Sequence, residues 1–291
     1  MKDEILEKYR EAGLIAAKIL RDGAKEIHIG TPYLDIVESI ESRVIEEGAA
    51  LAFPLNLSLN EDAAHDTASP GDIRIFARGD VAKLDLGVQV DGYIADTATT
   101  IDLGVNSLLV EASRQALEAA IRIIRPGVTA GDLGMAVQTA IESRGYRPIS
   151  NLTGHGLDQY ILHRSPIIPN VGINGGVTLE EGMVFAIEPF ATTGSGHVTE
   201  KTRKEIYSQI SSKPVRIPAG RAILEKIRDR HGLPFARRWL NEKRIELALP
   251  TLIRSQALHV YPVLSDIPGS LVSQAEHTVI VTADVCIVTT R

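Results

Sequence analysis

The sequence has a single cysteine, Cys286, so no disulfide bond can form within the chain. No signal peptide is expected, because the charged start Met1-Lys2-Asp3-Glu4 has none of the apolar character that such a peptide needs. No apolar run approaches the roughly 20 residues that span a membrane. These absences indicate a cytoplasmic protein that makes no membrane contact.

The sequence also has no large excess of either sign of charge. The net charge is only −6, which argues against a general binder of DNA or other nucleic acid. The rest of the composition is ordinary, with 44% hydrophobic and 23% charged residues in 291. A chain of this length can bury a sizeable core, as one large domain or as two lobes. We take it to be a globular monomer.

Two pairs of helices are expected in the first half, and the pairs resemble each other. Apolar periodicity predicts helices over 3–22 and 107–124. Each is followed by a helix with a threonine N-cap, Thr31 before Pro32 in one pair and Thr129 in the other. We interpret this as a weak internal repeat, two similar α/β halves facing each other across one site. A chance likeness of amphipathic helices is the alternative.

Strand-forming residues on both sides of Asp91-Gly92 predict a β-hairpin over 83–98. A two-residue turn there places Asp85 and Asp96 on the same face, about 7–8 Å apart at the backbone. Two carboxylates that converge on one face repel each other unless a cation lies between them, and a pair of divalent metal ions fits that gap. The alternative is two solvated acids on an exposed face.

Three further residues complete a candidate metal site. His155 lies between two glycines, Glu188 ends an apolar run, and Glu276 precedes another. An isolated charge is costly in such surroundings. Four acids and one histidine suit a carboxylate-rich site for two divalent ions, which can share an activated water and act as Lewis acids on a carbonyl.

The segment 195–258 differs from the rest. We interpret it as a basic helical subdomain inserted into a main domain formed by 1–194 and 259–291. Between residues 201 and 244 there are thirteen basic residues against four acids. The basic residues are Lys201, Arg203, Lys204, Lys213, Arg216, Arg221, Lys226, Arg228, Arg230, Arg237, Arg238, Lys243 and Arg244. One hypothesis is that this surface faces ribosomal RNA; a solvated surface without a partner is the competing interpretation.

Taken together, the motifs resemble the methionine aminopeptidase family over essentially the whole chain. The basic insert between Glu188 and Glu276 is similar to the type II branch, and the short N-terminal region is similar to the archaeal form. The motifs that carry the resemblance are Asp85 and Asp96 around Asp91-Gly92, Gly154-His155-Gly156, Ile187-Glu188-Pro189-Phe190 and Ala275-Glu276-His277-Thr278.

The resemblance implies an α/β pita-bread fold, with two pseudo-symmetric halves around a curved antiparallel sheet. It implies removal of the initiator methionine from nascent polypeptides with a small second residue, through attack of a metal-activated hydroxide on the first peptide carbonyl. Two divalent ions per chain would be Co, Mn, Fe(II) or Zn. Asp85 would bind one ion, His155 and Glu188 the other, and Asp96 and Glu276 both. Glu188 would also handle the proton of the attacking water.

The resemblance also implies roles outside the metal site. His65 matches a histidine that contacts the substrate amide, and His163 matches one that stabilises the tetrahedral oxyanion. Phe53 and Tyr261 are candidates for the apolar methionine pocket. The chain departs from the family after His65, where Asp66-Thr67-Ala68 replaces an aromatic residue followed by Thr-Pro, so the shape of this loop and its effect on substrate preference are open.

The other histidines are not expected to take part. His277 follows Glu276 directly and therefore points to the opposite face of the predicted strand. The remaining ones are interpreted as surface or packing residues: His28, His197, His231 and His259.

Two alternative functions stay open. One is a proline-directed aminopeptidase of the same fold, but such enzymes carry a large domain before the catalytic half, and Asp85 lies too early for it. The other is a non-catalytic homologue that binds RNA or protein. Such relatives lose metal ligands, whereas all five candidates are present here.

Overall fold

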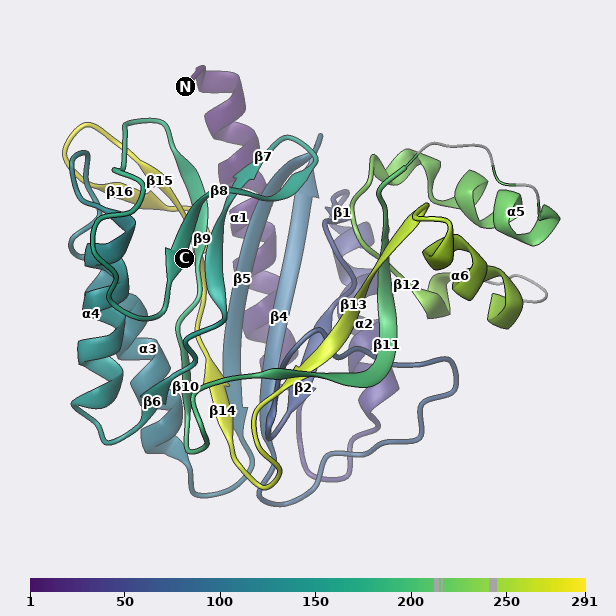
Figure 1. Cartoon of the computed structure of the whole chain (residues 1–291), viewed down its shortest axis with the longest axis horizontal. Coiled ribbons are helices and arrows are strands. Elements are labelled where there is room, and N and C mark those ends of the chain that lie inside the picture. The colour runs from purple at the N-terminus through teal and green to yellow at the C-terminus, as the bar shows by residue number, and fades with distance from the viewer. Residues whose placement is uncertain (212–214, 216, 241–244) are drawn as a thin grey trace.

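The structure is a computed structural model that describes all residues except 212–214, 216 and 241–244. Helices cover the outside of antiparallel sheets, and two helices form a separate lobe at the right of Figure 1. None of the helices in the described part is long and apolar enough to cross a membrane. The described helices are α1 (Asp3–Ala24), α2 (Tyr33–Glu46), α3 (Ser107–Ile121), α4 (Ala130–Glu142), α5 (Pro218–Lys226), α6 (Ile245–Arg254) and the short 3₁₀ turns η1 (Arg228–Arg230) and η2 (Arg237–Trp239).

The described strands pair only in antiparallel fashion, in four sheets. The first holds β1 (Ala50–Leu51), β4 (Val81–Val90), β2 (Asn56–Leu59) and β5 (Tyr93–Asp102). The second has the order β16 (Cys286–Val288), β15 (His277–Val281), β9 (Val184–Ile187), β7 (Thr153–Asp158), β8 (Ile161–Pro169). The third has the order β12 (Phe235–Ala236), β11 (Thr199–Gln209), β13 (Leu258–Ser265), β3 (Asp62–Ala64). The fourth is β14 (Val272–Gln274), β10 (Phe190–Thr192), β6 (Arg147–Pro148).

The predicted hairpin forms with the predicted register. Asp91 and Gly92 make the turn with φ of 52° and 87°, the positive values that a tight hairpin turn needs at both central positions. Asp85 therefore pairs with Ala98, and Asp96 with Gly87. The β5 edge of the hairpin contacts the second half of the chain. The N–H of Glu276 donates to the carbonyl of Ala98 at 3.1 Å, and the N–H of Ala98 donates to that of Glu276 at 3.4 Å. The two halves thus share one curved surface.

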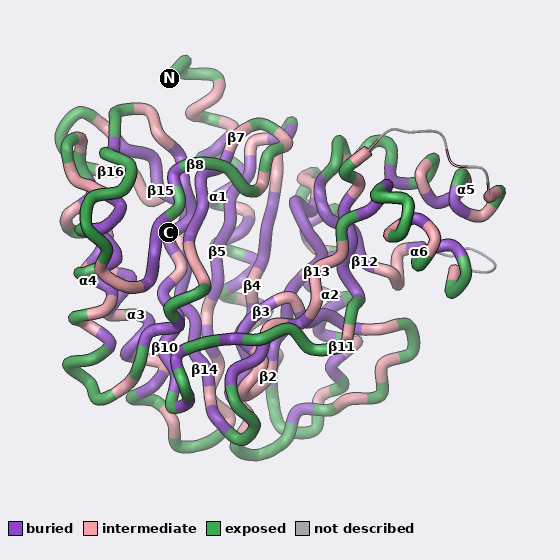
Figure 2. Tube along the Cα trace, viewed as in Figure 1, coloured by how far each residue is buried: buried purple, intermediate pink, exposed green. Residues whose placement is uncertain are grey.

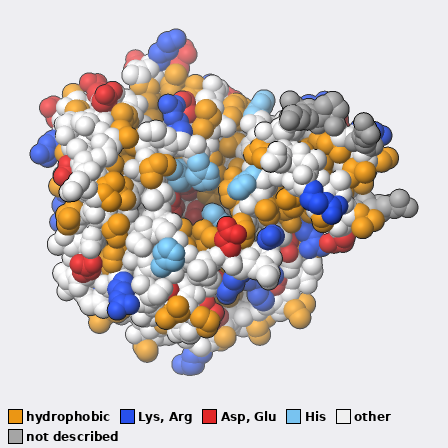
Figure 3. Space-filling model, in the orientation of Figure 1, with side chains coloured by type: hydrophobic (Ala, Val, Ile, Leu, Met, Phe, Trp, Pro, Cys, Tyr) orange, Lys and Arg blue, Asp and Glu red, His pale blue; other side chains and the backbone are white. Residues whose placement is uncertain are grey.

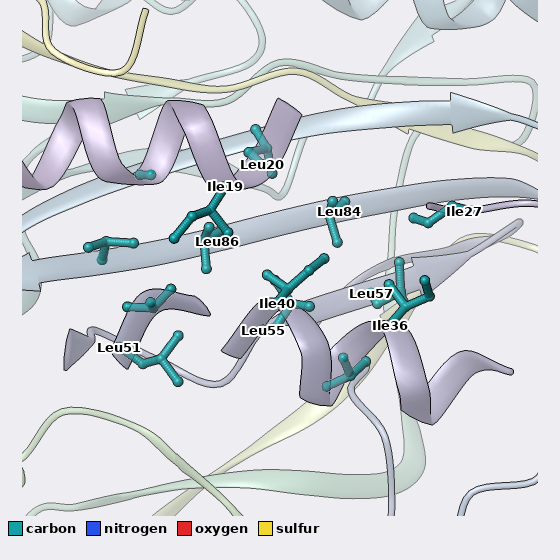
Figure 4. Close-up of a cluster of buried hydrophobic side chains, with 14 of the residues drawn as sticks. Ile19, Leu20, Ile27, Ile36, Ile40, Leu51, Leu55, Leu57, Leu84 and Leu86 are labelled. Carbon is teal, nitrogen blue, oxygen red and sulfur yellow. The ribbon is translucent and has the colours of Figure 1, made fainter. Parts of the chain in front are cut away.

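Each half packs a helix pair behind its sheet, as the internal repeat predicts. Apolar side chains of α1 and α2 interlock with those of β4 and β2 in the first half (Figure 4). Side chains of α3 and α4 pack against β9 and β15 in the second. In Figure 2 much of β4, β5 and β15 is buried, whereas most of β8 is exposed or intermediate. Burial of these apolar faces is the main driving force for the fold.

One of the two predicted threonine caps is wrong. Thr129 caps α4 in a reciprocal capping box with Asp132. Thr31 does not cap α2, because its carbonyl accepts the N–H of Phe76 and the next residue, Pro32, bridges to Ile75. The helix therefore starts one residue later than expected, with Pro32 at the cap and no side-chain cap bond.

The predicted insert contains both α5 and α6, which share a small apolar core of their own. It also contains β11, a long strand that pairs with β13. Helix α5 ends at Lys226; the short turn η1 follows, and His231 after it has a φ of 53°. Five charged residues of the insert lie outside the described part of the chain: Lys213, Arg216, Glu242, Lys243 and Arg244.

Candidate active site

All nine predicted site residues line one cavity, where the sheets of the two halves meet the sheet of β11 and β13. In Figure 3 histidine side chains surround a hollow, and acidic side chains lie deeper inside it. The residues that the structure brings together are Phe53, His65, Asp85, Asp96, His155, His163, Glu188, Tyr261 and Glu276.

The central hairpin supplies Asp85 and Asp96. Strand alternation and the tight turn place both carboxylates on the cavity face. Gly87, opposite Asp96, leaves room for the Phe53 ring, since a Cβ at this glycine would lie 2.2 Å from it. Small residues opposite the acids therefore create the space for the site.

His155 reaches the acids from the second half. It lies on β7 between β9 and β8, and a Cβ on either flanking glycine would fall 2.2–2.3 Å from a backbone oxygen of a neighbouring segment. The two glycines thus permit the close strand packing that holds the imidazole in place. Its Nε2 lies 3.6 Å from Asp96 Oδ2 and 3.6 Å from Glu188 Oε1.

The acidic groups form an arrangement that a cation would stabilise. Ligand atoms of Asp96, His155 and Glu276 all lie within 4.8 Å of one another. Glu188 touches the same imidazole, and Asp85 Oδ1 and Asp96 Oδ1 are buried without a hydrogen-bond partner among the described residues. Buried acceptors left without a donor are costly. Carboxylate oxygens and an imidazole nitrogen are suitable ligands for divalent transition metals, so the residues present fit metal ions.

The electrostatics agree with this arrangement. Burial raises the pKa of Asp85 to about 7. Burial, followed by repulsion from neighbouring carboxylates, raises the pKa of each of Asp96, Glu188 and Glu276 well above its usual value. Burial lowers the pKa of His155 to about 3, so its imidazole is neutral and free to bind a metal. Without a cation, four carboxylates in this space oppose each other's ionisation.

The two other predicted histidines both lie near the ring of Tyr261. The ring centroid of His65 lies 5.5 Å from that of Tyr261, and that of His163 lies 6.4 Å from it. His163 also contacts His155, with centroids 4.4 Å apart. Loss of solvation lowers the pKa of His65 to about 4, so it is a neutral donor or acceptor near neutral pH. Both imidazoles are therefore available to a molecule that enters the cavity.

Two polar residues of the site were not predicted from the sequence. Gln274 donates from Nε2 to Asp85 Oδ2 at 3.2 Å and to Glu276 Oε2 at 3.3 Å, and so links two candidate ligands. Asn56 pairs with Asp85 in the strand register and lines the cavity. The position of Gln274 two residues before Glu276 was a signal for that contact alone, since its other partner, Asp85, is 189 residues away in the chain. Asn56 had no such signal, because its partner is 29 residues away on another strand.

The remaining histidines differ in position. His277 contacts Thr290 at 2.8 Å and does not line the cavity, as expected from strand alternation. His259, interpreted as a surface or packing residue, packs edge-on against the cavity residue Tyr261 with centroids 4.7 Å apart. His231 packs on Tyr160.

The sequence has clear relatives. The family model described as "Metallopeptidase family M24" matches residues 7–283. The chain is 48% identical to a methionine aminopeptidase of Archaeoglobus fulgidus over 292 residues, an alignment that covers 100% of both chains. It is 45% identical to a methionine aminopeptidase of Methanothermobacter thermautotrophicus over 297 residues, with 99% of each chain covered.

Solved structures share the architecture. A methionine aminopeptidase from Thermotoga maritima aligns with a TM-score of 0.75 and 25% identity, covering 100% of this chain and 98% of that one. Prolidase from Pyrococcus furiosus aligns with a TM-score of 0.64 and 20% identity, covering 100% of this chain but only 64% of that one. The second likeness concerns the fold alone. The predicted pita-bread fold of two pseudo-symmetric halves around a curved antiparallel sheet is confirmed.

Proposed function

The chain belongs to metallopeptidase family M24, as its motifs predicted, and we propose that this member removes the initiator methionine from nascent proteins with a small second residue. The observation that carries the proposal is the full-length similarity to methionine aminopeptidases, combined with a cavity that gathers all five predicted metal ligands. The substrates are then the N-termini of newly made polypeptides.

We infer that the acidic cluster binds two divalent ions. Asp85 would hold one, His155 and Glu188 the other, and Asp96 and Glu276 would contact both. When bound, such ions lower the pKa of a shared water and polarise the scissile carbonyl. The ligand types admit Mn, Fe(II), Co and Zn.

Side chains of the protein would supply proton transfer, oxyanion stabilisation and substrate binding. Glu188 Oε1 lies 3.6 Å from His155 Nε2, where a carboxylate can take the proton of an attacking water. His163 would donate to the oxyanion that forms at the carbonyl, and His65 would contact the substrate amide. Phe53 and Tyr261 would form the apolar pocket for the methionine side chain.

We also propose a cellular location, an oligomeric state and a partner for the enzyme. We infer a cytoplasmic monomer made of a catalytic domain (1–194 and 259–291) with the basic insert 195–258. The excess of basic residues between 201 and 244 is the motive for proposing contact with ribosomal RNA, although Arg203 and Arg238 are engaged in ion pairs with acids of the first half; a solvated surface is the competing interpretation. Ribosome affinity that falls steeply with salt is expected if the contact is electrostatic. Absent or salt-independent affinity would remove this hypothesis.

The decisive experiment compares hydrolysis of Met-Ala-Ser with that of Xaa-Pro peptides. The protein would be stripped with a chelator and then assayed with and without added Mn²⁺ or Co²⁺. We expect metal-dependent release of free methionine from Met-Ala-Ser and little cleavage before proline. Preferential cleavage of Xaa-Pro peptides would favour the proline-directed alternative. No peptidase activity with any metal would favour the non-catalytic one.

A further inference from the structure

The loop after His65 is held by an arginine from β11, two strands away from β3 in the same sheet. The side chain of Asp66 is only 1% exposed, and its carboxylate accepts from Arg74 and, at 2.8 Å, from Arg203 Nε. Asp72 accepts from the same two arginines, at 2.7 Å and 3.1 Å. Two acids and two arginines thus form a closed, charge-balanced network. It lies where the chain departs from its family after His65.

Arg203 comes from β11, and its neighbour on β11, Lys204, pairs with Pro262 on β13. His65 Nδ1 lies 3.3 Å from the carbonyl oxygen of Pro262. The contact of His65 with Pro262 and the ion pair of Asp66 with Arg203 therefore attach two consecutive residues after β3 to the paired strands β13 and β11. Moving one attachment displaces the other.

The backbone of His65 needs such support. Its φ is 64°, in the left-handed region that a residue with a side chain rarely adopts. Conformations of this kind are energetically unfavourable and persist only where the surroundings hold them. The next residue along the chain is Asp66, whose side chain has two charged partners and whose carbonyl accepts the N–H of Leu57 at 2.8 Å.

We propose that Asp66 and Arg203 are positioning residues, whose ion pair holds the His65 imidazole at its place in the cavity. The inference rests on the proposed function, in which His65 contacts the substrate. Neither residue lines the cavity. A change at either residue should therefore alter kcat by displacing the His65 imidazole, apart from any change in fold stability.

The kinetic test is a double-mutant cycle on the metal-loaded enzyme. Asp66→Asn and Arg203→Met are each expected to lower kcat for Met-Ala-Ser by about tenfold at unchanged metal content. In a His65→Ala background, Asp66→Asn should change kcat by less than about twofold, because the group that it positions is gone. Asp266→Asn is the matched control, since it also removes a buried, hydrogen-bonded carboxylate but one outside the cavity. Its kcat should match that of the wild type.

A second measurement does not depend on activity. With ¹³C-labelled histidine, the His65 ring signals, assigned by their loss in His65→Ala, should shift in Asp66→Asn and Arg203→Met but not in Asp266→Asn. Arg203→Lys keeps the charge without the two-pronged geometry and serves if either variant does not fold; it should shift the same signals less. The inference would be overturned if the His65 signals stayed unchanged in folded variants. It would also be overturned if Asp66→Asn lowered kcat as much in the His65→Ala background as in the wild type. A wild-type enzyme that releases no methionine refutes the proposed function, while the ring signals still decide the positioning.

Discussion

At the scale of single residues, Asp96 is the point where the two halves of the site meet. Its carboxylate comes from the central hairpin, faces His155 of the second half at 3.6 Å, and belongs to the tight cluster with Glu276. Its backbone N–H and carbonyl are also tied to the Thr278 hydroxyl, at 2.7 and 2.8 Å. These backbone bonds fix the position of the carboxylate between the other ligands.

Asp96→Ala is therefore expected to abolish the proposed activity, with kcat/KM for Met-Ala-Ser lower by at least about 10³-fold. The reason is that one side chain would serve both metal ions. Metal content by mass spectrometry and steady-state rates check this. Asp158→Ala, which removes an exposed acid paired with Arg164, is the control and should keep full activity. Substantial turnover in the metal-saturated Asp96 variant would contradict the assignment.

Strand alternation made the partnership of Asp85 and Asp96 predictable, since the turn at Asp91-Gly92 fixes the register. The place of Gln274 between Asp85 and Glu276 was not predictable in the same way. A glutamine in a strand has no preferred role until its neighbours on other strands are known.

At the scale of elements, two threonines that look alike in sequence behave differently. Thr129→Ala should destabilise the protein by about 1 kcal/mol, because it removes the capping bond to Asp132 at the start of α4. Thr31→Ala should change stability by less than about 0.5 kcal/mol, because Thr31 makes no cap bond with α2. Equal losses in chemical denaturation would show that the capping geometry has no energetic effect.

An acid on helix α3, Glu111, should make the stability of the protein depend on pH. The bonds from Arg114 and Gln115 lower the pKa of Glu111 to about 2, below that of the unfolded chain. The native state therefore holds fewer protons, and this stabilisation is present above about pH 4.5 and is lost as the pH falls towards 2. Solvent screening limits it to at most about 1 kcal/mol. Glu111→Gln should lower the unfolding free energy at pH 7 but not at pH 2; an equal deficit at both would contradict the ion-pair origin.

At the scale of the whole molecule, the insert is joined to the first half by a buried ion pair. Arg238 donates to Glu41 and also to Thr67 Oγ1 at 2.9 Å, and the side chains of Arg238 and Glu41 are only 5% and 9% exposed. Trp239 donates to the second oxygen of the same glutamate at 2.8 Å. This contact connects α2 with η2, elements about 200 residues apart in the chain.

Arg238→Met should therefore lower the free energy of unfolding by about 3–5 kcal/mol, because it leaves a buried carboxylate without its cation. Arg228→Met removes an exposed ion pair on the same insert, with both side chains 65% exposed, and should change stability by less than about 1 kcal/mol. Urea denaturation of both variants measures the difference. Similar losses for the two would mean that the buried pair does not stabilise the contact with the insert.

The sequence by itself determined the helix pairs, the central hairpin and its register, and the set of acids and histidines that line the cavity. These follow from periodicity, turn chemistry and motif spacing, which act over a few residues or are shared with a family. Only the tertiary structure decided that Thr31 does not cap, that Gln274 links two acids, and that Asp66 is bound by Arg203. Each of these depends on a partner far away in the chain, and local sequence carries no information about which distant strand will lie beside it.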